Sequence, residues 1–253
     1  DAVCYGGAFS AVREAAAPVA TGADQRVVVV ELFTSQGCSS CPAADRVLAG
    51  LSDSERDRVV PLAFHVDYWN HIGWQDPFSS EQWTRRQHAY AGAFQSRRIY
   101  TPQAIVDGRT DIVGSDSSKL HKAIAVAAAL PGGRITITAE PGTAAAIAVR
   151  CHVLRPPGLR DRRLDLMVAL YEDGLVTAVK SGENSRRTLR NERVVRQLLT
   201  AATLPVGGAS ESESRVELLL DAAWNRARLG VAAFLQDPTT LAIEGASASS
   251  LIR

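Results

Sequence analysis

Two cysteines separated by two serines are the residues of this chain best suited to redox chemistry. They are Cys38 and Cys41, in the run Cys-Ser-Ser-Cys. The thiolate form of cysteine attacks disulfides, and a Cys-X-X-Cys motif at a helix N-terminus lowers the thiol pKa from its usual value of about 8.5. We therefore expect Cys38 to attack and Cys41 to resolve the resulting mixed disulfide. The small, polar serines between them should leave Cys38 approachable.

The flanking sequence predicts the elements that hold this pair. Residues 27–33 form an apolar run typical of a strand buried on both faces, and residues 34–37 break it with turn-forming residues. After the cysteines, one helix face recurs at Ala44, Val47, Leu48 and Leu51. Pro42 is tolerated in the first turn, where backbone N–H groups have no intrahelical partner. Cys38 should therefore lie at or just before the helix N-terminus, with Cys41 one turn further in.

The rest of the chain changes character near Pro131. Up to residue 130 the expected order is β-α-β-α-β-β-α. After it, short strands separated by turn residues are typical of a small antiparallel sandwich or barrel, and residues 191–200 are ambiguous between helix and strand. The expected strands of this second part are 134–140, 144–151, 164–171, 175–180, 215–221 and 231–236.

The first part resembles the thioredoxin superfamily in its order of elements and in the placement of its cysteines. In that family a cis-proline loop lies beside the redox pair and precedes the third strand of the sheet. Thr101-Pro102 stands just before the expected strand 104–106, and only X-Pro bonds adopt the cis form at appreciable frequency. The resemblance implies that Pro102 shapes a substrate groove and that the backbone around Thr101 pairs with an extended substrate.

Four longer motifs resemble an exported bacterial thioredoxin-like family whose function is uncharacterised. They lie at residues 31–45, 64–69, 100–103 and 182–189, so the resemblance covers most of the chain. It implies an α/β fold, with a thioredoxin-like domain at 26–130 followed by a smaller antiparallel β-sandwich or barrel domain at 131–253. Residues 1–25 are expected to be a loosely ordered leader.

The same resemblance implies export. The chain begins with Asp1 rather than Met, which fits a removed signal peptide or a trimmed chain. We therefore expect a periplasmic or secreted protein. The chain lacks a Trp before Cys38 and a Gly-Pro between the cysteines, as true thioredoxins have, so the direction of electron flow stays open. The leading hypothesis is a thiol–disulfide oxidoreductase of the cell envelope.

The cysteine pair has other interpretations. An exported protein can use it as a static disulfide. A structural zinc site needs four ligands, and the sequence holds no second CxxC and no HxxxH, so we expect no metal and no cofactor. A copper or zinc carrier could add His65, His71 or His88, although solvated or hydrogen-bonded histidines explain these residues more simply. The alternative function is thus a metal carrier or a partner-binding module with a structural disulfide. A peroxide-reducing enzyme ranks last, because no peroxide-activating Thr and Arg surround Cys38.

The other two cysteines, Cys4 and Cys151, could form a structural disulfide that ties the leader to the second part of the chain. Two free thiols are the other possibility.

The aromatic loop at residues 67–78 holds two of the four Trp residues. Core packing beneath a long loop is one explanation. The functional one is a substrate platform near Cys38 that includes Tyr68 and Trp69. Asp67, at the start of this loop, could accept a proton from Cys41.

The composition and net charge of the chain argue against some classes of binding partner. Hydrophobic residues make up 46% of the chain and the net charge is +1, so the chain can build a core and has no global field that attracts nucleic acid or anionic membrane. No apolar run approaches the ~18–20 residues of a membrane-spanning helix. The expected partner is a protein or small-molecule thiol or disulfide, and the sequence does not indicate the oligomeric state.

Overall fold

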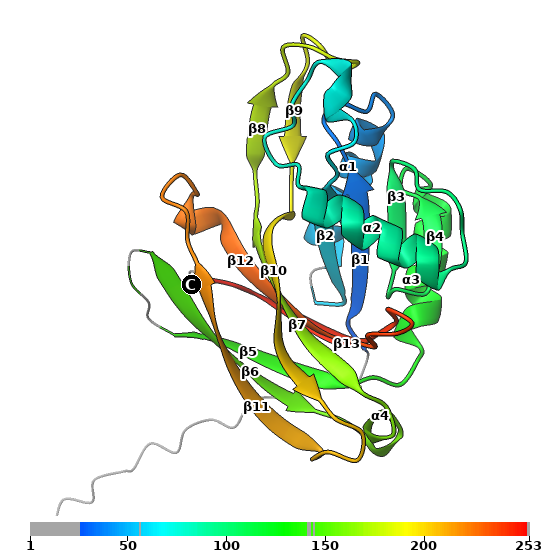
Figure 1. Ribbon diagram of the computed structural model, residues 1–253, viewed down its shortest axis with the longest axis vertical. Helices are drawn as coiled ribbons and strands as arrows, with labels where there is room; N and C mark the ends of the chain where they lie inside the picture. The colour runs from blue at the N-terminus through cyan, green and yellow to red at the C-terminus, as the bar shows by residue number, and fades with distance from the viewer. Residues whose placement is uncertain (1–25, 56, 141–142, 144, 252–253) are drawn as a thin grey trace, which may run out of the picture.

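The structure is a computed structural model that describes residues 26–55, 57–140, 143 and 145–251 (Figure 1). The expected leader at 1–25, with Cys4, lies outside the described residues. The helices of the described residues are α1 (Cys41–Ser54), α2 (Glu81–Ala93), α3 (Ser117–Ala128), α4 (Pro157–Arg160) and the 3-10 turns η1 (Asn70–Ile72) and η2 (Arg226–Arg228). None of the helices in these ranges is long and apolar enough to cross a membrane.

The strands of the first part are β1 (Val28–Thr34), β2 (Val59–His65), β3 (Gln103–Val106) and β4 (Thr110–Val113). Those that follow are β5 (Arg134–Glu140), β6 (Ala146–Leu154), β7 (Leu164–Glu172), β8 (Leu175–Ala178), β9 (Thr188–Asn191), β10 (Val194–Leu204), β11 (Glu211–Leu219), β12 (Leu229–Gln236) and β13 (Ile243–Ser250).

Eight of these strands form one mixed sheet in the order β13-β12-β7-β10-β2-β1-β3-β4. β1 and β2 run parallel, and α1 connects them. β10 joins the free side of β2 in parallel, with Val194 opposite Ala63 and the Ala63 N–H donating to the Arg193 carbonyl at 2.8 Å. Strands from before and after Pro131 therefore share a sheet.

The predicted fold class is wrong. We expected a thioredoxin-like α/β fold followed by a separate, smaller antiparallel β-sandwich or barrel. The structure is instead mostly β, with 42% strand and 21% helix, and it is built on the large eight-stranded sheet. The reason is that hydrophobic periodicity indicates a strand but not the strand with which it pairs. The division at residues 26–130 and 131–253 stays a prediction of the sequence.

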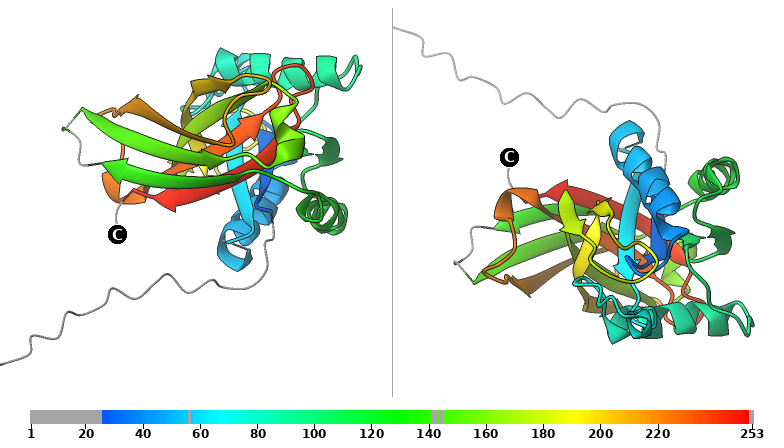
Figure 2. Two further views of the ribbon diagram at one scale, coloured as in Figure 1. Left: turned by 90° about the horizontal axis from the view of Figure 1, so that it is seen from below. Right: turned by 90° about the horizontal axis from the view of Figure 1, so that it is seen from above.

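Helices cover both faces of the sheet around β1 (Figure 2). α2 packs Trp83 and Tyr90 onto one face, against Phe33 and Phe64. α1 and α3 pack onto the other face, with Leu48 of α1 among the buried residues there. Covered on both sides, β1 and β2 are buried along their whole length, which explains their continuous apolar runs.

A second sheet, ordered β11-β6-β5, packs against the later strands of the large one. Leucines of β7 and valines of β6 meet in this second core. β8 and β9 form a separate two-stranded hairpin. It projects to the top of Figure 1, beside the loop that leads into α1, so a late segment of the chain reaches the cysteine motif.

Candidate functional site

Cys38 and Cys41 form a disulfide, with their Cα atoms 5.4 Å apart. α1 begins at Cys41, after Ser40 at the N-cap and with Pro42 in the first turn. The Cys41 N–H donates to the Cys38 carbonyl, which closes a tight turn between the two sulfurs. Cys38 therefore precedes the helix as predicted, whereas Cys41 is its first residue and not one turn further in.

The disulfide is buried. The exposed fractions are 1% for Cys38 and 0% for Cys41, while Ser39 and Ser40 are exposed. The expectation that the two serines leave Cys38 approachable is wrong, because the serines themselves face solvent and the sulfurs turn inward. Both sulfurs are therefore closed to solvent in this conformation.

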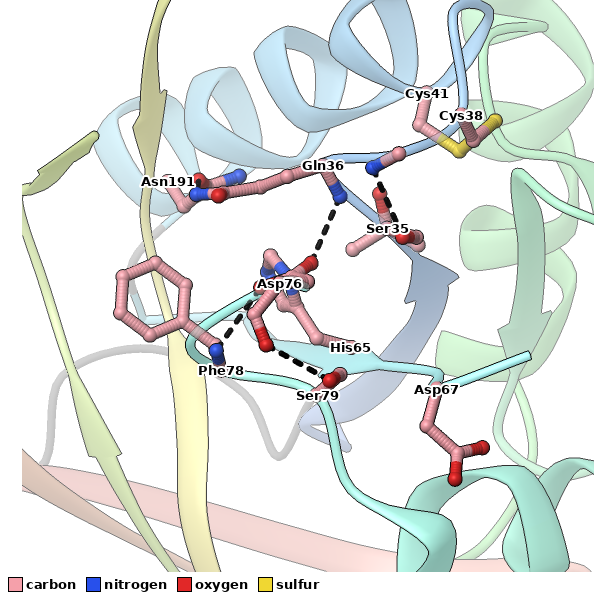
Figure 3. Close-up of polar contacts among 12 residues, drawn as sticks. Ser35, Gln36, Cys38, Cys41, His65, Asp67, Asp76, Phe78, Ser79 and Asn191 are labelled. Carbon is pink, nitrogen blue, oxygen red and sulfur yellow. Dashed lines mark hydrogen bonds and ion pairs between the residues drawn. A yellow bond between two sulfur atoms is a disulfide. The ribbon is translucent and has the colours of Figure 1, made fainter. Parts of the chain in front are cut away.

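The loop before Cys38 is fixed by a buried carboxylate from the aromatic loop (Figure 3). Asp76 Oδ2 accepts from the Gln36 N–H at 2.8 Å and from Nδ1 of His65 at 2.7 Å. Its other oxygen, Oδ1, accepts from the Phe78 N–H at 2.9 Å. Asp76 and His65 are both buried, so this ionisable pair sits directly beneath the cysteine loop.

A chain of polar side chains continues from Gln36 toward α1. Gln36 Nε2 donates to Asn191 Oδ1 at 3.0 Å, and Asn191 Nδ2 donates to Asp45 at 3.3 Å. Asp45 also accepts from the Thr34 hydroxyl at 2.8 Å. Asp45 lies four residues after Cys41 on α1, so the two share a helix face. The side chains that precede and follow the cysteines thus belong to one network.

The ionisable members of this network have shifted pKa values. Burial raises the pKa of Asp45 to about 6, although His65 and Thr34 oppose the shift. Burial alone would lower the pKa of His65, but the Asp76 carboxylate outweighs it and the net shift is upward. Burial alone would raise the pKa of Asp76, but His65 and backbone N–H groups hold it below its usual value. Ionisable groups with shifted pKa values occur often at functional sites, although structural networks contain them too.

The turn between β8 and β9 contacts the cysteine loop directly. Asn184 Nδ2 donates to the carbonyls of Gln36 and Cys38, each at 2.9 Å. The Glu183 carboxylate accepts from the Ser39 N–H at 2.8 Å. Two neighbouring residues of the second part of the chain therefore bind the backbone on both sides of Cys38.

The predicted substrate residues lie close to one another. The Thr101-Pro102 peptide bond is cis, and Pro102 is buried. Trp69 Nε1 donates to the Thr101 hydroxyl at 2.7 Å. A Cβ added at Gly37 would lie 3.1 Å from the Trp69 Cβ, so Trp69 connects the cysteine loop with the proline loop. The Pro102 carbonyl accepts from the Gly114 N–H at 2.9 Å.

Tyr68 and Asp67 occupy different surroundings. Tyr68 packs against the core beside Thr101 and Gln87, and burial raises its pKa although both neighbours oppose the shift. Asp67 accepts from the Thr84 hydroxyl at 2.5 Å, and Figure 3 shows its carboxylate pointing away from the cysteines. The structure therefore connects Thr101 through Trp69 to Gly37, the residue before Cys38, and leaves the Asp67 side chain at α2.

The three histidines considered as metal ligands do not converge on the cysteines. His65 is paired with Asp76, the exposed His71 donates to the Tyr68 carbonyl at 2.6 Å, and His88 is exposed on α2. In the part of the chain that the structure describes, no group of three His, Cys, Asp or Glu side chains could hold a metal ion.

Cys151 is buried on β6 and has no disulfide partner among the described residues, and burial raises its pKa to about 11. Its predicted partner Cys4 lies outside the described residues. Their disulfide therefore stays a prediction.

Sequence reasoning assigned no role to Gln36, Asp45, Asp76, Glu183 and Asn184. A signal was present for most of them, because Gln36 and Asp45 lie in the first resemblance motif and Glu183 and Asn184 in the last. Asp76 lies in the aromatic loop, where nothing in the sequence distinguishes it from Asp67 as the carboxylate that turns toward the motif.

Two solved structures are similar to this chain. Protein AGR_C_4864 from Agrobacterium tumefaciens shares 28% identity with a TM-score of 0.70, and the match covers 90% of this chain and 96% of that one. HBP35 of Porphyromonas gingivalis shares 16% identity with a TM-score of 0.63, over 91% of this chain and 76% of that one. The second likeness concerns the fold alone.

The comparison with curated proteins gives no match. A family profile does match, over residues 29–236, which is most of the chain and includes both the cysteine loop and the β8–β9 turn. This agrees with the expected membership of a family without an assigned activity, and it leaves the thioredoxin-like assignment without support. The chain belongs to the family described as protein of unknown function DUF1223.

Proposed function

We propose that this protein carries out thiol–disulfide exchange through Cys38 and Cys41. The observation that carries the proposal is the disulfide at the start of α1 together with the polar network built around its loop. A disulfide that serves only as a staple does not require a buried carboxyl group with a pKa of about 6 and a buried histidine–carboxylate pair beside it.

The reaction follows from the order of the two sulfurs. In the reducing direction, the Cys38 thiolate attacks one sulfur of a partner disulfide and forms a mixed disulfide, and the first partner sulfur leaves as a thiolate. The Cys41 thiolate then attacks the Cys38 sulfur and releases the second partner thiolate. Two electrons pass to the partner, and the Cys38–Cys41 disulfide remains. The oxidising direction is the reverse, with a partner dithiol as the electron donor.

Neighbouring residues have roles in this proposal. Thr101 and Pro102 would form the substrate groove, and the hydrogen bond from Trp69 to Thr101 connects that segment with the cysteine loop at Gly37. Asp45, with a pKa of about 6 and one helical turn beyond Cys41, is a better proton acceptor for Cys41 than Asp67. The proposal includes export to the periplasm or beyond, since disulfides persist in oxidising compartments.

The burial of both sulfurs favours a second candidate, a partner-binding protein in which the disulfide is structural. The two candidates differ in reduction potential. Structural disulfides lie below about −300 mV, whereas working dithiol exchangers span about −120 to −270 mV.

The test is titration of the full chain against glutathione and dithiothreitol, with trapped thiols assigned by peptide mass spectrometry. Exchange activity predicts a potential in the working range and turnover of a model disulfide. Cys38→Ser should abolish turnover, and Cys41→Ser should accumulate a mixed disulfide at Cys38. Cys151→Ser is the matched control, because it removes a buried thiol on β6 and should turn over as the wild type does.

A potential below about −300 mV without turnover would reject exchange in favour of the structural disulfide. Circular dichroism of each variant separates loss of chemistry from loss of folding.

A further inference from the structure

The β8–β9 turn is held against the cysteine loop by a fixed amide. Asn184 is fully buried, and its Nδ2 bridges the carbonyls of Gln36 and Cys38. Arg187 Nη1 donates to Asn184 Oδ1 at 3.1 Å. Since the carbonyl oxygen of the amide is bonded to a donor and its nitrogen to two acceptors, the side chain has a single orientation. The backbone of the neighbouring residue, Glu183, is therefore held beside the cysteine loop.

Glu183 puts a negative charge at the residue that follows Cys38. Its carboxylate accepts from the Ser39 N–H at 2.8 Å. Hydrogen bonds from Ser39 lower the pKa of Glu183, so the carboxylate is ionised at neutral pH. The side chain is exposed, and its position is set by the turn and not by burial.

A Cys38 thiolate would be stabilised by the same backbone N–H groups that Glu183 uses. Unpaired N–H groups and the positive end of the dipole at a helix N-terminus favour a cysteine anion there. Glu183 takes one of the N–H groups in the loop that leads into α1, and its charge repels a second anion nearby. The two negative groups compete for the same short stretch of backbone.

We propose that Glu183 is a positioning residue that disfavours the Cys38 thiolate and thereby holds the Cys38–Cys41 pair toward the disulfide. This inference rests on the proposed redox role of the pair. It also assigns a role to the motif at residues 182–189. The equilibrium between the disulfide and the dithiol of Cys38 and Cys41 would depend on a turn in the second part of the chain.

Other ionisable groups around the loop act in the background. They come from every element packed on it and are Asp45 on α1, His65 on β2, Asp76 in the aromatic loop and Arg187 in the turn. All of them remain when Glu183 is changed, so a matched comparison cancels their titration.

The test measures the acidity of Cys38 in the reduced full chain. Alkylation rates by iodoacetamide are followed against pH, and the modified Cys38 peptide is quantified by mass spectrometry. Glu183→Gln keeps an oxygen that accepts from Ser39 but removes the charge. We expect the pKa of Cys38 to fall by about 0.5 to 1 unit. Glu183→Lys should lower it further, because the shift follows the charge.

The second measurement is the equilibrium with glutathione at pH 8. Glu183→Gln should shift the equilibrium constant toward the dithiol by about three- to tenfold, where tenfold corresponds to about 30 mV. The matched control is Glu217→Gln on β11, an exposed glutamate in the three-stranded sheet, which should change neither quantity.

Three outcomes overturn the inference. The first is a Cys38 pKa that does not change in Glu183→Gln. The second is a Cys38 pKa that falls equally in Glu183→Gln and Glu183→Lys. The third is a fall of the same size in the control Glu217→Gln. Failure of the proposed function is distinguishable from these, because the acidity of Cys38 is measured in the reduced protein whether or not it exchanges disulfides with a partner.

Discussion

The two ends of β1 both bury ionisable side chains, but with different partners. At its start, Arg26 pairs with Asp107 at 2.8 Å, and both side chains are almost fully buried. Arg109 and Arg162 both bind Glu244 nearby, at 2.8 and 2.7 Å. At its far end, the buried carboxylates contact histidine, amides, hydroxyls and backbone N–H groups.

Burial raises the pKa of a carboxyl group at both ends, to about 6 for Asp107 and about 6 for Asp45. A raised pKa is therefore not by itself a mark of reactivity. The difference lies in the counter-charge, because an arginine stays protonated under all ordinary conditions, whereas His65 is a histidine that can gain or lose its proton, with its pKa raised by the Asp76 carboxylate against the opposing effect of burial. At the start of β1 the positive partner therefore keeps its charge, whereas at the end beside the disulfide the histidine can also exchange its proton.

The largest expected effect tests the buried ion pair between Arg26 and Asp107. Arg26→Met keeps the aliphatic stem and leaves Asp107 as an uncompensated buried charge, so we expect a loss of about 3–5 kcal/mol in the free energy of unfolding at pH 7. Without Arg26 the pKa of Asp107 rises above its value of about 6, so the variant takes up the proton first and the loss should shrink as the pH falls toward 6. Urea unfolding measures both.

The matched control is Arg85→Met, which breaks an exposed pair with Glu81 on α2 and should cost less than about 0.5 kcal/mol. Adding Asp107→Asn to Arg26→Met should recover most of the loss. Equal costs for Arg26→Met and Arg85→Met would contradict the distinction between the two ends.

The next effect concerns His65. His65→Phe keeps a ring in the core but deprives Asp76 of a partner, so we expect a loss of about 2 kcal/mol near pH 6. The pKa of His65 is raised in the folded state, so this stabilisation is fully present below about 6.5 and is lost as the pH rises through the folded value. The pKa of Asp76 is lowered, so the stabilisation also fades as the pH falls below about 3.8.

Urea unfolding of the wild type and His65→Phe from pH 4 to 9 checks this window. A constant difference between the two curves would mean that the histidine contributes by packing alone.

A comparable effect is expected for Asp45, with the opposite dependence on pH. Its pKa is raised in the folded state, so the folded protein binds the proton more tightly and loses stability as the pH rises from about 3.8 to 6. A shift of about two pKa units corresponds to about 3 kcal/mol of that loss. Asp45→Asn should remove it, seen as a flatter curve of unfolding free energy against pH. Parallel curves for the two proteins would rule out titration of Asp45 in this range.

The smallest effect tests the contact between the aromatic loop and the proline loop. Trp69→Phe removes the hydrogen bond to Thr101 and should cost about 1 kcal/mol. Thr101→Val removes the same bond from the other side and serves as the matched variant. A double-mutant cycle by urea unfolding should give a coupling of similar size. Additive losses would mean that the bond contributes nothing.

Most helices and strands could be predicted from the sequence, but the way in which the strands pair into sheets could not. The strand at 27–33, the helix after Pro42 and the hairpin at residues 107–108 are encoded by local patterns, so the structure agrees with them. The ambiguous segment 191–200 became β10, because its partners β7 and β2 decide its conformation. β13, rich in Gly, Ala and Ser, carries no strand signature and owes its strand to pairing with β12.

The same limit applies to the site. The pairing of Cys38 with Cys41 follows from their spacing, whereas the burial of both sulfurs depends on segments far away in the chain. Asn184 binds the Cys38 carbonyl across 146 residues. No local pattern could indicate that contact, nor that Asp76 and not Asp67 turns toward the loop.

The pairing of β2 with β10 also has a consequence for the order of synthesis. β2 ends at His65 and β10 begins at Val194. At about 5–20 residues per second, a ribosome needs roughly 6 to 26 s to make the intervening chain. During that time one side of β2 has N–H and C=O groups without their final partner, and such an unpaired edge readily binds other strands. The nascent chain must therefore be kept from its neighbours for as long as the later strands take to emerge.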